Sequence, residues 1–144
     1  TGFDPQSPCG ATVGAQRESY QVGRLTELSN ECIGAGEPPL TVETLSPLTE
    51  AESRIGAGTL DAVFADAVVL AYMVEQSGQK LVLIGDVVDS ERQGVAVSKD
   101  NEQLTVAVQA GLQHLMDKGY LEQILNTYGI GDLALTQAQI SPAH

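Results

Sequence analysis

The sequence predicts an α/β protein in which helices cover both faces of a parallel β-sheet. Short apolar segments typical of strands alternate along the chain with longer segments of helical periodicity. The strand-like segments 61–65 and 81–84 are apolar almost throughout, as parallel strands buried on both faces are. Ligands of such sheets bind at the carboxyl ends of the strands, so the residues that follow each strand are the first candidates for a site.

The first half of the chain is expected to begin with a strand at residues 12–16 and a helix from Ser19 to about residue 30. A Gly- and Pro-containing turn at 33–39 ends this helix, and residues 40–45 alternate as a second strand.

Ser46 and Pro47 then predict a helix to residue 55, with Ser46 as N-cap and Pro47 at the first helical position. Residues 61–65 form the next strand, and Asp66 is placed to cap a helix over 67–76.

The second half is expected to contain apolar strands at 81–84 and 94–97. The pair Asp100 and Gln103 has the spacing of a capping box and predicts a helix that runs to Lys118. Residues 120–128 form a last helix after Gly119.

Composition restricts the class of function. The chain has 144 residues, of which 42% are hydrophobic, and a formal net charge of −12. So acidic a surface repels phosphate backbones, so we expect no nucleic-acid partner. The sequence has no apolar run of the roughly 18 residues that a membrane-spanning helix needs.

The two cysteines, Cys9 and Cys32, leave two alternatives open. In an exported protein they would form one disulfide, and in a cytosolic protein they would be separate buried thiols. Their spacing and the two histidines do not indicate a metal site, and no cofactor is expected.

Two positions that follow strands are candidates for ligand contact. Ser19 would open a helix whose free N–H groups suit a carboxylate, although a plain helix cap explains it too. Asp66 interrupts an apolar stretch, and burial of an unpaired carboxylate is costly. It therefore caps a helix, binds an ammonium group in a cleft, or does both with its two oxygens.

A phosphoacceptor site is the other interpretation of Asp66, together with Lys99. Such a receiver needs paired carboxylates after the first strand to hold a divalent metal, and only Glu18 is present there, beside Arg17. The chain also lacks the phosphate-binding and nucleophile motifs GxxxxGK[ST] and GxSxG.

Several segments resemble one family. They are CGATVGAQRESYQ from residue 9, the turn CIGAGEP from residue 32, LDAVFADAVVLAY from residue 60 and QGVAVSKDNEQLTVAVQAGLQHLMDKGYLEQILNTYGI from residue 93. Together they resemble the amino-acid-binding family 3 of extracytoplasmic solute-binding proteins, the receptors of ABC importers. The resemblance covers about residues 9–135 and is most specific in the last segment.

This resemblance implies the type II periplasmic-binding-protein fold, in which two α/β lobes are joined by crossover strands and close on the ligand. Residues 1–92 would form the second lobe, a three-layer structure with a parallel sheet. Residues 93–144 would form the return strand and the C-terminal helices that normally complete the first lobe, most of which is missing.

The resemblance also implies residue roles. Asp66 falls where the family binds the ligand ammonium, Ser19 where a Thr binds the carboxylate, and Gln21 on a frequent polar contact. Arg17 and Tyr20 lie in the same segment. Glu18 replaces the usual Gly; it either lines the cleft, where it would favour a ligand with an extra cation such as arginine or lysine, or is a solvated residue of the helix start.

The resemblance further implies a disulfide between Cys9 and Cys32, an amino acid as ligand, an ABC transporter permease as partner, and an extracytoplasmic, lipid-anchored location. It implies a binding protein and no enzyme. The alternatives are an enzyme of the same fold, similar to cyclohexadienyl dehydratase, and the sensing domain of a receptor.

The helices over 101–128 would lose their cover with the missing lobe. Their apolar stripe consists of Leu104, Val108, Leu112, Leu115, Leu121, Ile124 and Leu125. Three arrangements are open: the helices fold back on the second lobe, they pair with another copy, or a separate chain supplies the lobe. We expect self-association through 101–128, with residues 94–99 as a hinge.

Overall fold

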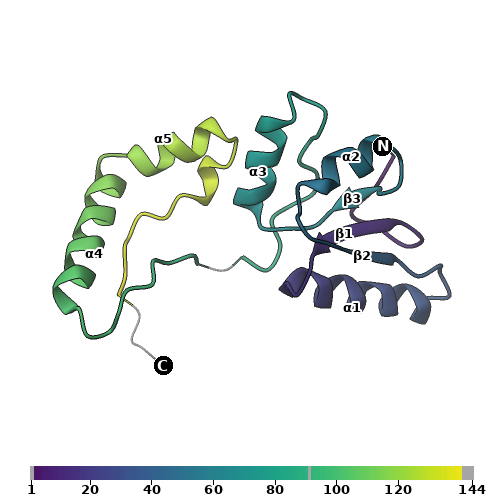
Figure 1. Cartoon of the computed structure of the whole chain (residues 1–144), viewed down its shortest axis with the longest axis horizontal. Helices are drawn as coiled ribbons and strands as arrows, with labels where there is room; N and C mark the ends of the chain where they lie inside the picture. Colours follow the sequence, from purple (N-terminus) through teal and green to yellow (C-terminus); the bar gives the residue numbers. More distant parts are fainter. Residues whose placement is uncertain (1, 91, 141–144) are drawn as a thin grey trace. The chain divides into compact units, whose positions relative to one another are not determined.

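The computed structural model describes residues 2–90 and 92–140. The chain divides into two compact units, Thr1–Asp86 and Val87–His144, which are described separately. Figure 1 labels the helices and strands of both units.

The first unit is built on a three-stranded parallel sheet in the order β2-β1-β3. Strand β1 (Thr12–Gln16) is central, β2 (Thr41–Leu45) pairs with it along five residues, and β3 (Ala62–Val63) pairs with its middle. The predicted α/β class and parallel sheet are thus confirmed.

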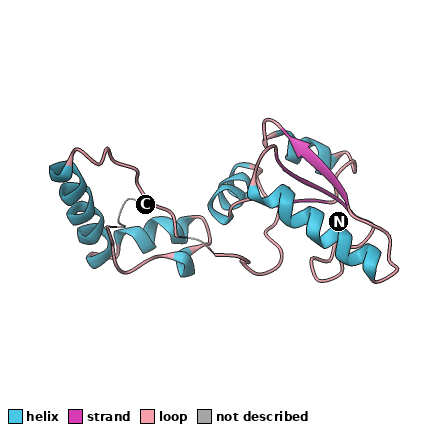
Figure 2. Ribbon diagram, turned by 90° about the horizontal axis from the view of Figure 1, so that it is seen from below, coloured by secondary structure: helices cyan, strands magenta, loops and turns pink. Residues whose placement is uncertain are grey.

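Helices lie on both faces of this sheet, which makes three layers. Helix α1 (Tyr20–Gly34) connects β1 to β2, and helix α2 (Glu50–Gly56) connects β2 to β3. Because β2 and β3 flank β1 on opposite sides, right-handed crossovers place the two helices on opposite faces. Figure 2 shows α1 running along one face.

Successive residues of β1 face opposite sides of the sheet, and a hydrophobic core lies on each side. Val13 and Ala15 are buried against Leu25 and Cys32 of α1. Gly14 faces the other way, where a Cβ atom would lie 2.9 Å from Leu45 Cδ1. The second core, around Leu45, Ala51 and Leu60, packs under α2 and receives Met73 from α3 (Ala67–Gln76).

A disulfide between Cys9 and Cys32 joins the entry segment to the last turn of α1, as the resemblance predicted. Cys32 is part of the core, and α1 continues past the predicted end near residue 30 to Gly34. Packing of Cys32 therefore extends the helix into the segment that the glycines marked as a turn.

The start of α2 differs from the prediction. The helix begins at Glu50 with Thr49 at the N-cap, so Pro47 does not occupy the first helical position. The intervening residues form turns, in which the N–H groups of Glu50 and Ala51 donate to the carbonyl oxygens of Pro47 and Leu48.

The predicted strands at 81–84 and 94–97 are wrong, because both segments lack regular structure. Val82 is 73% exposed and Val95 is 62% exposed. A strand needs a neighbour to satisfy its backbone hydrogen bonds, and the described sheet offers none to these segments.

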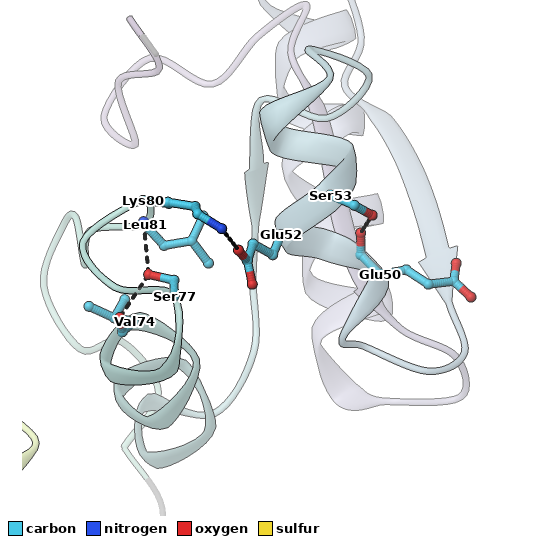
Figure 3. A network of polar contacts seen from close by, with 7 residues as sticks. All are labelled: Glu50, Glu52, Ser53, Val74, Ser77, Lys80 and Leu81. Carbon is cyan, nitrogen blue, oxygen red and sulfur yellow. Dashed lines mark hydrogen bonds and ion pairs between the residues drawn. The ribbon is translucent and has the colours of Figure 1, made fainter.

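The chain after α3 is instead held by side chains (Figure 3). The buried Ser77 hydroxyl accepts from the Leu81 N–H at 3.1 Å and donates to the Val74 carbonyl at 2.8 Å. Lys80 forms an ion pair of 3.0 Å with Glu52 of α2. These contacts attach the segment to the first unit without a sheet.

The second unit contains α4 (Glu102–Asp117), α5 (Tyr120–Thr127) and the 3-10 helix η1 (Gly131–Leu133). Asn101 caps α4 by accepting from the Leu104 N–H at 3.1 Å, so the predicted cap at Asp100 is one residue early. No residue of α4 or α5 is buried. Within the described part of this unit one residue is buried, Ile130, which is 7% exposed.

Candidate ligand-binding site

A pocket of about 180 Å³ lies at the carboxyl ends of β1 and β3. Its lining residues are Gln16, Arg17, Glu18, Ser19, Gln21, Leu48, Ala65, Asp66 and Val69. This is the edge at which parallel sheets bind ligands. The structure thus brings together two segments that are far apart in sequence, the turn after β1 and the residue after β3.

A tight turn presents the first of these segments. The Arg17 N–H donates to the Leu45 carbonyl at 3.0 Å, and the Ser19 N–H donates to the Gln16 carbonyl at 3.2 Å. These two bonds tie the turn to β2 and to the end of β1. Residues 17–19 are therefore held at the pocket.

Ser19 is the N-cap of α1, but its side chain makes no capping hydrogen bond. Its Oγ atom is buried and has no hydrogen-bond partner among the described residues. A buried hydroxyl without a partner is unfavourable, and here it lines a pocket at the positive end of a 15-residue helix. The arrangement suits an anionic group such as a carboxylate.

Asp66 precedes α3 and occupies its N-cap position, as predicted, yet its side chain does not cap the helix. Instead Oδ1 accepts a hydrogen bond from Gln21 Nε2 at 2.7 Å. Gln21 comes from the first turn of α1, so this bond links the two segments across the pocket. The second carboxylate oxygen of Asp66 makes no protein hydrogen bond within the described ranges and suits a cation.

Glu18 has a φ angle of +59°, in the left-handed region. Glycine adopts this conformation without steric cost, whereas a residue with a Cβ atom is strained there. The turn therefore has the geometry of the glycine that the resemblance expected at this position. Glu18 is a lining residue of the pocket, as is Arg17.

Tyr20, which the resemblance placed in the site segment, is 64% exposed and does not line the pocket. Conversely, sequence reasoning missed the apolar lining formed by Leu48, Ala65 and Val69. Leu48 follows β2, so the rule about carboxyl ends of strands would have found it. Val69 lies one helical turn after Asp66, a spacing that puts both on the same side of α3.

Other kinds of site find no support in residues 2–90 and 92–140. No group of three or more His, Cys, Asp or Glu side chains there is placed to hold a metal ion. Over the same ranges, no helix combines the length and apolar character that crossing a membrane requires.

Fold and pocket together point to a class of protein. A three-layer α/β lobe with a polar pocket at the carboxyl ends of its parallel strands is consistent with one lobe of a periplasmic-binding-protein-like fold. The carboxylate and the open helix end match the two charged groups of a small zwitterion.

A comparison with curated proteins agrees with this class. The chain is 30% identical over 142 residues to the arginine-binding protein ArgT of Corynebacterium glutamicum. The match covers 98% of this chain and 46% of ArgT, so the chain spans about half the length of this relative. No family model and no solved structure matches the chain.

The predicted resemblance to amino-acid-binding solute-binding proteins is thereby confirmed, and it extends along nearly the whole chain.

Proposed function

We propose that this chain is the ligand-binding lobe, with part of the companion lobe, of a receptor that captures a free amino acid. The observation that carries the proposal is the pocket in which the open N-terminus of α1 and Asp66 converge. The name of the relative ArgT, an arginine-binding protein, supports an amino acid as the ligand.

The two ends of the pocket provide complementary sites for an α-amino acid. The ligand carboxylate would accept from Ser19 Oγ, which has no hydrogen-bond partner among the described residues and lies at the positive end of the α1 dipole. The ligand ammonium would donate to Asp66, whose orientation Gln21 holds. Leu48 and Val69 supply apolar walls between these polar groups.

The organisation of the intact protein follows from the same proposal. Residues 1–92 would be the second lobe, and residues 93–144 would return to complete the first. The described division of the chain after Asp86 lies close to this boundary.

The cellular role follows from the class of protein. The receptor would be extracytoplasmic and lipid-anchored, and it would deliver the amino acid to the permease of an ABC transporter. The Cys9–Cys32 disulfide is consistent with an oxidising compartment.

Isothermal titration of the intact protein with amino acids tests the proposal. Asp66→Asn keeps the size of the side chain and removes its charge. We expect affinity to fall at least about tenfold, because a charge-assisted hydrogen bond contributes roughly 1.5–3 kcal/mol.

The matched control is Glu75→Gln, which removes an exposed carboxylate at the other end of α3. It should leave affinity unchanged. Equal affinity of Asp66→Asn and the wild type would contradict the assignment of the ammonium site.

A further inference from the structure

We infer that Glu18 determines specificity and selects an amino acid with a positively charged side chain. The inference rests on the amino-acid site proposed above. Its starting point is the position of Glu18, which lines the same pocket as Ser19 and Asp66.

The charges of the pocket are not balanced by the protein. The charged residues of its lining are Glu18 and Asp66, which are acidic, and Arg17, which is basic. Arg17 and Glu18 make no ion pair or side-chain hydrogen bond within residues 2–90 and 92–140. The Glu18 carboxylate is therefore available to a ligand.

Glu18 is exposed, and a ligand bound beside it removes part of the water around its carboxylate; a cation on the ligand offsets this cost. The α-ammonium group is already assigned to Asp66, so the required second cation must come from the ligand side chain. Arg17 is exposed, and its long stem lets its guanidinium stay hydrated when the pocket is filled.

The net charge of the pocket also favours a ligand with a cationic side chain. A zwitterionic ligand leaves the pocket with a net negative charge, a cationic ligand neutralises it, and an acidic ligand adds a further negative charge. The chain as a whole has a net charge of −12, which attracts cations from solution. An amino acid with a guanidinium or ammonium side chain is the best electrostatic match.

The backbone provides a way to separate a functional role of Glu18 from a structural one. At φ +59° a glycine would be unstrained, so Glu18 makes the turn less stable than glycine would. Glu18→Gly should therefore raise the melting temperature or leave it unchanged while it removes selectivity. A residue that only supported the turn would show the opposite effect on stability.

The test compares arginine with citrulline, its uncharged isostere, by titration calorimetry on the intact protein. The wild type should bind arginine at least about tenfold more tightly than citrulline, as expected for one charge-assisted contact. Glu18→Gln and Glu18→Gly should reduce this ratio towards one. The control Glu37→Gln, an exposed carboxylate outside the pocket, should preserve it.

Each other outcome identifies what is wrong. An arginine-to-citrulline ratio near one in the wild type, or a ratio unaffected by Glu18→Gln, overturns the role of Glu18 while the amino-acid site stands. A lower melting temperature of Glu18→Gly assigns the residue a structural role and also overturns the inference. Absence of binding to any amino acid overturns the proposed function itself.

Discussion

Removal of the Cys9–Cys32 disulfide should destabilise the first unit by about 3 kcal/mol. The bond joins residues separated by 23 positions, and the loop that it closes contains β1 and most of α1. In the chain-entropy model a closed loop of this length lowers the entropy of the unfolded chain by an amount equivalent to roughly 3 kcal/mol at 25 °C. Because small domains are stable by only about 5–15 kcal/mol, the loss is large.

Cys9→Ala is the best perturbation, because Cys32 is 4% exposed and contributes to the core, whereas Cys9 lies at its edge. Urea denaturation followed by far-UV circular dichroism measures the change in the free energy of unfolding. For a unit of this size, 3 kcal/mol corresponds to a decrease of about 12 to 24 °C in melting temperature.

Reduction of the wild type with dithiothreitol should cause a similar loss and should leave the double variant Cys9→Ala/Cys32→Ala unchanged. A loss below about 1 kcal/mol for Cys9→Ala would refute the reasoning, since it would mean that loop closure contributes little to the stability of this unit.

Two further predictions concern the pocket and the second unit. Gln21→Leu should weaken amino-acid binding about twofold to tenfold in titration calorimetry, because Asp66 loses its 2.7 Å donor, while Gln76→Leu outside the pocket should have no effect. The isolated 144-residue chain should associate through residues 101–128, where Val106 is 57% and Ile124 is 56% exposed, and light scattering should report a dimer that Ile124→Lys weakens. A monodisperse monomer of the unaltered chain would contradict the second prediction.

Local signals in the sequence determined several elements on their own. The bounds predicted for β1 and α3 agree with the structure, and α5 ends one residue before the predicted end. In these cases the signals that define the element, its hydrophobic periodicity and the turn residues at its ends, all lie within or beside the segment itself. The location of the candidate site could also be predicted from the sequence, because the carboxyl ends of parallel strands meet at one edge of a sheet.

Tertiary structure decided the rest. An apolar run such as residues 81–84 becomes a strand only beside another strand, and the described chain supplies no such neighbour. The end of α1 depends on the burial of Cys32 in the core, which the glycines after it do not reveal.

The detailed geometry of the pocket likewise depends on contacts between segments far apart in sequence. The bond between Gln21 and Asp66 spans 45 positions, and the turn that holds Glu18 at φ +59° is tied to Leu45 of the neighbouring strand. Sequence pattern reports which residues follow a strand. Only packing and hydrogen bonding between distant segments decide which of those side chains meet and which remain available to a ligand.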